Sequence, residues 1–161
     1  MSNVKKCDQK PTKYDVYDYW TDCRLKLHDL LIRKFGYKFR LAEKKELKRF
    51  GVSKYEDLTD EQKEVYDHHI RAIIEFNTWY IQNSREAIIN AARGVTKYLA
   101  LAEESSGSKK DQYFKNAKGY CNFIEQELQF VMDTLPVSVE TFMEFAEMLG
   151  EEMELIEGCF L

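Results

Sequence analysis

Apolar side chains recur every three or four residues along most of this chain, and this spacing restricts its fold more than any other feature. The first such set is Val16, Trp20, Cys23, Leu27, Leu30 and Leu31. A later set is Phe114, Ala117, Cys121, Ile124, Leu128, Val131 and Leu135. Steps of three and four place side chains on one side of an α-helix, whereas a half-buried strand alternates every second residue. The sequence therefore predicts an all-α protein.

Turn-forming residues are scarce, with two prolines and seven glycines, which favours helices over an all-β fold, and a length of 161 residues is within the usual size of one domain. We expect a flexible arm at residues 1–11 and a single all-α domain at residues 12–161. The domain is predicted to be an antiparallel helical bundle of four or five main helices plus a short basic helix. The expected helices span residues 12–36, 37–51 (the short basic one), 60–104, 111–135 and 138–157. The segment 104–110 is the clearest predicted loop.

The long segment 60–104 leaves one question open. Thr59 and Gln62 have the spacing of a capping box, which predicts a helix start near Asp60. A stripe for burial is predicted in the first half of this segment, at Val65, His69, Ile73, Phe76 and Tyr80. The pattern is consistent with one continuous helix or with two helices that break near Asn83.

Charge is distributed unevenly along the chain. Residues 1–50 have a net charge of +7, residues 51–110 of −2 and residues 111–161 of −9. This asymmetry either places opposite potentials on different faces or lets packed helices neutralise one another. No run of about 18 uncharged apolar residues occurs and the first residues lack an apolar core, so we expect a cytoplasmic protein without a membrane partner. The four cysteines, Cys7, Cys23, Cys121 and Cys159, are expected to be reduced.

The C-terminal segment VETFMEFAEMLGEEMELIE, residues 139–157, has the sequence of a strongly amphipathic helix. At about 100° per residue, one stripe holds five carboxylates: Glu140, Glu144, Glu147, Glu151 and Glu154. The opposite face holds Phe142, Phe145, Leu149, Met153 and Ile156. Met143 and Met148 lie beside the acids. We expect the apolar face to be buried and the acids to be accessible.

Three interpretations of this acidic stripe are open. It is a solvated face neutralised by cations of the same molecule, a docking surface for a basic partner, or an imitation of nucleic-acid phosphates. Flexible methionines beside charges suit adaptable protein contacts. We therefore favour a non-enzymatic inhibitor or adaptor that binds another protein through Glu140, Glu144, Glu147, Glu151, Glu154, Met143 and Met148.

A basic segment near the N-terminus supports a competing hypothesis, contact with nucleic acid. Its cations are Arg33, Lys34, Lys38, Arg40, Lys44, Lys45, Lys48 and Arg49. Aromatic residues alternate with these cations, and exposed rings can stack on bases. Glu43 and Glu46 dilute the positive charge of the segment.

Signals for catalysis are weak. The sequence contains no GxSxG, GxxxxGK[ST], GxGxxG or HExxH motif, the usual motifs of acyl transfer, nucleotide binding and zinc proteolysis. A metal-dependent hydrolase is the second alternative, with His28, Asp67, His68 and Glu75 as the residues that could assemble a site. We predict no catalytic residue, no cofactor and no metal ligand, and self-association through Trp79 stays open.

Overall fold

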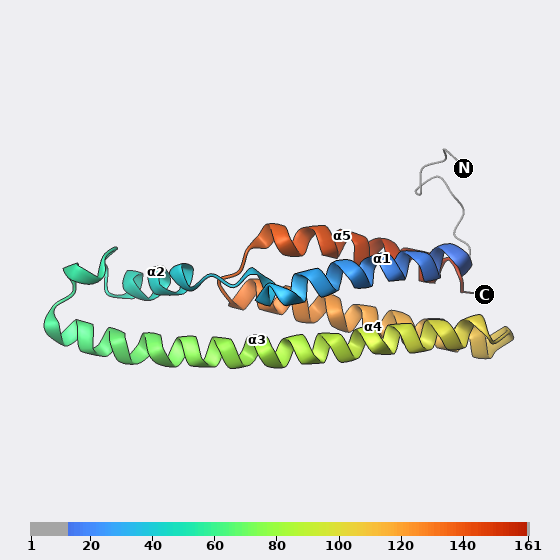
Figure 1. The fold of residues 1–161 in the computed structure, drawn as a ribbon, viewed down its shortest axis with the longest axis horizontal. Helices are drawn as coiled ribbons and strands as arrows, with labels where there is room; N and C mark the ends of the chain where they lie inside the picture. The colour runs from blue at the N-terminus through green and yellow to red at the C-terminus, as the bar shows by residue number, and fades with distance from the viewer. Residues whose placement is uncertain (1–12, 161) are drawn as a thin grey trace.

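The protein is described at residues 13–160 by a computed structural model, so the predicted arm at residues 1–11, with Cys7, lies outside the described residues. Its α-helices are α1 (Lys13–Ile32), α2 (Phe39–Arg49), α3 (Asp60–Glu103), α4 (Gly107–Thr134) and α5 (Val139–Glu157). Two short 3₁₀ turns, η2 (Lys34–Gly36) and η3 (Tyr55–Asp57), precede α2 and α3. Neighbouring long helices run antiparallel (Figure 1). The predicted all-α bundle with a short basic helix is thus confirmed.

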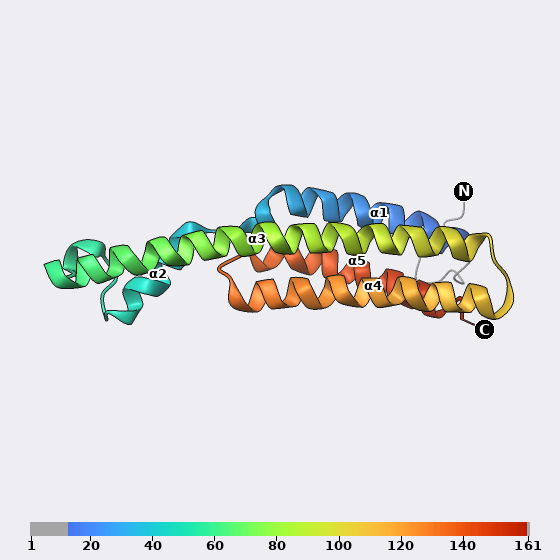
Figure 2. The same cartoon turned by 90° about the horizontal axis from the view of Figure 1, so that it is seen from below.

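Four helices enclose the main hydrophobic core: α1, α4, α5 and the C-terminal half of α3 (Figures 1 and 2). Each contributes a helical stripe of buried side chains, such as Leu27 of α1, Ile124 of α4 and Phe145 of α5. A polar contact also joins α1 to α3, because Trp20 Nε1 and Arg24 Nη1 both donate to Thr96 Oγ1, at 2.9 and 2.8 Å.

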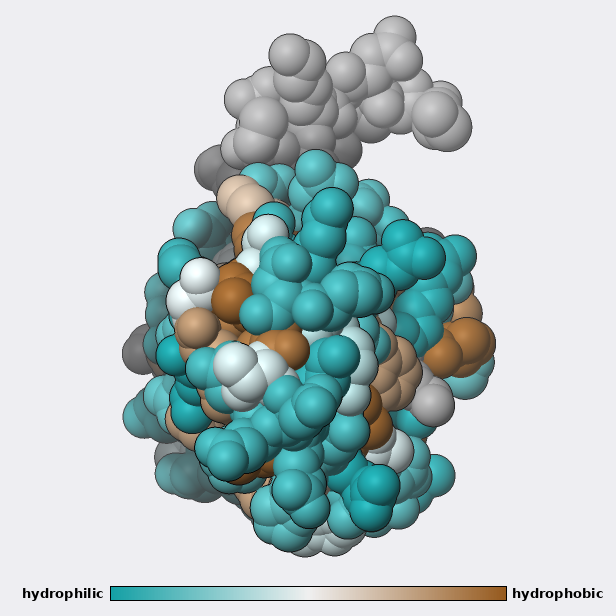
Figure 3. Space-filling view, turned by 90° about the vertical axis from the view of Figure 1, so that its left-hand side faces the viewer, coloured by the Kyte–Doolittle hydropathy of each residue, from teal (hydrophilic) through white to brown (hydrophobic). Residues whose placement is uncertain are grey.

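A projection extends beyond this bundle. Helix α3 has 44 residues, which corresponds to about 66 Å at 1.5 Å per residue, and its first half leaves the bundle with only α2 folded back on it (Figures 1 and 2). We call residues 39–77 the projection. Its own small core consists of Leu47, Leu58 and Tyr66. Viewed from this end, the surface is mostly hydrophilic with separate apolar areas (Figure 3).

The connection that leads into α2 and the connection between α4 and α5 are joined by backbone hydrogen bonds at the base of the projection. Lys38 N donates to Pro136 O at 2.9 Å, and Ser138 N donates to Gly36 O at 3.3 Å. Phe35 has a left-handed backbone with φ of 58°, which is costly for a residue with a side chain. Its ring is fully buried and packs 5.7 Å from the ring of Phe142, so core packing holds this conformation in place.

The open question about residues 60–104 is resolved in favour of one helix. The predicted capping box at its start is confirmed: Gln62 N donates to Thr59 Oγ1 at 3.2 Å, and Thr59 N donates to Gln62 Oε1 at 3.0 Å. The helix continues through Asn83 without a break. The next residue, Ser84, is buried and donates a hydrogen bond to Glu127 of α4. The predicted loop at 104–110 was too long, since α4 begins at Gly107.

The stripe predicted for burial in the first half of α3 was wrong at three of its five positions, since of its members Ile73 and Tyr80 alone are half-buried. Val65 and Phe76 are 45% and 59% exposed, and His69 is exposed as well. The buried positions there are Tyr66, Asn77, Ile81 and Ser84. Two of these are polar residues whose partners lie on other elements: Asn77 Nδ2 donates to the Tyr37 hydroxyl and Ser84 Oγ donates to Glu127. A pattern of apolar residues alone could not reveal them.

Candidate protein-binding surface

Helix α5 is positioned by its apolar face, as predicted. Phe142, Phe145, Leu149, Met153 and Ile156 are all buried against the bundle. The helix begins after Ser138, which occupies the N-cap position without a side-chain hydrogen bond. The opposite face, with its carboxylates, is therefore directed away from the core.

The five carboxylates of this stripe, Glu140, Glu144, Glu147, Glu151 and Glu154, are all exposed. We call them the acidic stripe. In the part of the chain that the structure describes, one of them forms an ion pair: Lys26 Nζ of α1 lies 2.8 Å from Glu144 Oε1. Lys26 and Arg33 also border a small hollow with Glu140 and Glu144. Neutralisation from within the molecule thus reaches the N-terminal end of the stripe, and the described residues form no ion pair with Glu147, Glu151 or Glu154.

The walls beside α5 differ in charge. After Lys118 the chain contains ten acidic residues and no Lys, Arg or His, so α5 and most of α4 supply no cation to their shared surface. Lys118 itself is paired with Glu157 at the C-terminal end of α5. The α1 side of α5 is mixed in charge, whereas the α4 side is acidic.

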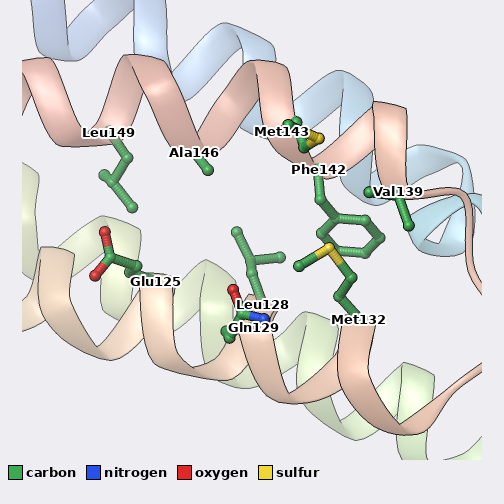
Figure 4. Close-up of a pocket in the computed structure, with 9 residues that line it drawn as sticks. All are labelled: Glu125, Leu128, Gln129, Met132, Val139, Phe142, Met143, Ala146 and Leu149. Atoms are coloured by element: carbon green, nitrogen blue, oxygen red, sulfur yellow. The ribbon is translucent and has the colours of Figure 1, made fainter.

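An apolar groove lies between α4 and α5 on this acidic side (Figure 4). Its volume is about 310 Å³. Its apolar lining is Leu128, Met132, Val139, Phe142, Met143, Ala146 and Leu149. Glu125 and Gln129 of α4 form its polar edge (Figure 4). Val139 and Met143 are 50% and 55% exposed, so the groove is open to solvent.

The two methionines predicted for partner binding lie in different environments. Met143 lines the groove, next to the acidic stripe. Met148 is half-buried against the main core, and its carbonyl oxygen accepts a hydrogen bond from the Cys23 thiol at 3.6 Å. Met148 does not line the groove, and its contact with a partner stays a prediction.

The α4 wall was missed by sequence reasoning. Leu128 and Met132 are four residues apart on α4, which places them on one face, but nothing in their spacing says that this face borders α5. On α5, a usable signal did exist: Val139, Met143 and Ala146 lie on the helical wheel between the buried face and the acids. Apolar residues at such a boundary indicate an exposed apolar edge.

The basic segment lies in the projection and at its base. Lys38, Arg40, Lys44, Lys45, Lys48 and Arg49 are exposed. Arg33 is exposed and lies 3.6 Å from Asp29, and the side chain of Lys34 lies outside the described parts. Helix α3 packs beside α2, and residues 37–80 hold nine cations and nine acids. This balance weakens a phosphate-binding surface, and the nucleic-acid hypothesis stays a prediction.

The remaining chemical groups do not assemble into a site among the residues described. No three His, Cys, Asp or Glu side chains within residues 13–160 lie close enough to hold a metal ion, so the combination of His28, Asp67, His68 and Glu75 is not brought together. Cys121 is a buried free thiol, and burial followed by the charge of Glu152 raises the pKa of Cys121. Within the same residues no helix combines the length and apolar character needed to cross a bilayer.

Comparisons with protein-family models, curated proteins and solved structures found no significant match to this chain.

Proposed function

We propose that this protein is a non-enzymatic, cytoplasmic inhibitor or adaptor that binds another protein through α5 and the groove beside it. The partner element that fits is an amphipathic helix with cations flanking its apolar face. Binding of this kind regulates a partner by covering the helix that it presents.

One observation carries the proposal: an open apolar groove whose two walls contribute carboxylates and no cation. Apolar grooves accept helices through side chains at helical spacing. The lined stretch of α5, Val139 to Leu149, is about 15 Å long at 1.5 Å per residue, which matches two to three turns of a bound helix. Exposed carboxylates at the margin then attract the cations of that helix.

The methionines add adaptability to this surface. Met132 of α4 and Met143 of α5 both line the groove, and Met132 extends toward Phe142 (Figure 4). Their unbranched side chains fill irregular space, so the groove can accommodate partner side chains of different shapes. Burial of partner side chains there contributes about 25 cal/mol for each Å² of apolar surface removed from water.

The proposal is tested with a defined probe, an 18-residue helical peptide of Leu and Lys with its leucines on one face. We expect it to bind, and we expect a scrambled peptide of the same composition to bind at least about tenfold more weakly, because it lacks a continuous apolar face. Fluorescence anisotropy measures both affinities. Affinity for the helical peptide should fall as salt rises, since exposed charges are screened.

Two protein variants locate the binding site. The double variant Glu147→Lys/Glu154→Lys should weaken peptide binding about tenfold or more, and Glu43→Lys/Glu104→Lys makes the same charge change away from the groove. Met143→Lys places a cation at the groove, and its matched control is Leu25→Lys, at a residue of α1 that is 67% exposed. Equal affinities for the site variants and their controls would show that the groove is not the binding site.

A further inference from the structure

A second exposed surface lies on α3, on the side opposite its buried residues. Phe76 and Trp79 are each 59% exposed, and Phe130 of α4 is 51% exposed. Their rings form a continuous series with Tyr80, with centroid separations of 5.9 Å for Phe76 and Trp79, 6.2 Å for Phe76 and Tyr80, and 5.9 Å for Tyr80 and Phe130. Large exposed aromatic clusters mark sites of association.

The charges along this face of α3 are arranged symmetrically about Trp79. Going outward from Trp79, Arg71 on one side corresponds to Glu86 on the other. Farther out, Glu64 corresponds to Arg93, and Glu61 to Lys97. In each case the two residues lie at nearly equal distances from Trp79 and have opposite charge.

These six residues are all exposed, and at about 100° per residue they lie on the side of α3 that carries Trp79. None of them forms an ion pair with another described residue. The remaining charged residue at this face, Glu75, corresponds to the amides of Gln82 and Asn83. An antiparallel copy of the same helix would therefore meet opposite charges or amides along its length, and no like charges.

We propose that a second copy of this chain packs antiparallel against this face of α3, with the two-fold axis near Trp79. Such an interface is isologous, because each pair occurs twice by symmetry. The two Trp79 side chains meet at its centre and the charged pairs flank them, which is the distribution of an interface with an aromatic core and a polar rim. The paired stretch from Glu61 to Lys97 is about 54 Å long.

This proposal is independent of the groove between α4 and α5, since it uses a different face of the molecule. It also accounts for the exposure of Phe76, which the predicted stripe placed in the core. In the dimer, the first half of α3 acquires a second neighbour besides α2.

The oligomeric state is measured by sedimentation velocity on the full chain, whose monomer mass is 19.1 kDa. We expect a dimer at micromolar concentration, and Trp79→Ala should sediment as a monomer with an unchanged circular dichroism spectrum. A chain that stays monomeric up to about 100 μM, a concentration far above that of specific association, would overturn the proposal.

Charge exchange tests the antiparallel register. Arg71→Glu and Glu86→Arg should each raise the dimer dissociation constant about tenfold, because each converts two attractive pairs into two repulsive ones. The double variant Arg71→Glu/Glu86→Arg restores opposite charges and should return the constant to within about threefold of the starting protein. Arg40→Glu, on α2, is the matched control and should leave dimerisation unchanged. A double variant as weak as the single variants would contradict this register and the proposal.

Discussion

The bundle and the projection share one helix, α3, but they surround it differently. In the bundle, α3 is packed against α1 and α4, and its buried residues, such as Ile88, Val95 and Leu99, join the main core. In the projection it has α2 alone, and the buried cluster there consists of Leu47, Leu58 and Tyr66. The same helix therefore passes from a region with a continuous core to a region with a small one.

This difference shows which interactions stabilise the projection. A pair of helices buries one stripe of each and leaves most of both surfaces in water, which gives little hydrophobic stabilisation against the entropy of ordering. Part of its order comes from continuity with the bundle, because extending a formed helix is easier than starting one. The capping box at Thr59 and Gln62 closes the far end. We therefore expect the projection to open locally more often than the bundle.

The largest expected effect is that of Leu27→Ala in α1. Leu27 is 1% exposed within the main core, and removing a buried leucine side chain leaves a cavity, so we expect the global free energy of unfolding to fall by about 2–5 kcal/mol. Chemical denaturation checks this, with Leu25→Ala as control because Leu25 is 67% exposed on the same helix. Equal losses in the two variants would mean that α1 is not packed as described.

A smaller and local effect is expected from Leu47→Ala in α2. Leu47 is 8% exposed and belongs to the small core of the projection. If the projection opens as a unit of its own, this substitution should accelerate amide hydrogen exchange in residues 39–77 while changing the global free energy of unfolding by less than about 1 kcal/mol. Hydrogen exchange read by mass spectrometry separates the two regions. Faster exchange throughout the bundle would show that projection and bundle unfold together.

The same contrast explains which parts of the fold could be predicted from sequence. In α1 and α5 the buried face is mainly apolar, for example at Leu27 and Phe145, with Glu152 of α5 as a buried exception, so periodicity identified both faces. Along α3, polar Asn77 and Ser84 are buried with their partners while Phe76 is exposed. A rule that counts apolar residues fails where hydrogen bonding offsets the burial of polar groups.

The sequence predicted one wall of the candidate site, the one formed by α5, and missed the wall formed by α4. The acids and Met143 of α5 follow from the helical wheel, because a wheel needs only local geometry. Leu128 and Met132 of α4 could not be assigned to the groove, since their position relative to α5 depends on how the helices pack. The proposed self-association surface was hidden for the same reason: the side of Trp79 that is free is known only once α1, α2 and α4 are placed around α3.

The smallest expected effect concerns Tyr80, where α3 enters the bundle. The Tyr80 hydroxyl donates to Glu127 Oε2 at 3.1 Å, and Ser84 Oγ donates to the same oxygen at 2.7 Å. Burial, followed by the negative charge of Glu127, raises the pKa of Tyr80 to about 12 from its ordinary value of 10.0. Because the unfolded chain loses this proton at lower pH than the folded protein, the stabilisation is fully present below about pH 10 and is lost as the pH rises to about 12.

Tyr80→Phe should therefore show a weaker decline in melting temperature across this interval than the starting protein. Burial also raises the pKa of Tyr17 to about 12, so a decline should persist in the variant, and the difference between the two proteins is the quantity to measure. Parallel declines from pH 9 to 12 would mean that the proton of Tyr80 does not couple α3 to α4 at the point where the projection leaves the bundle.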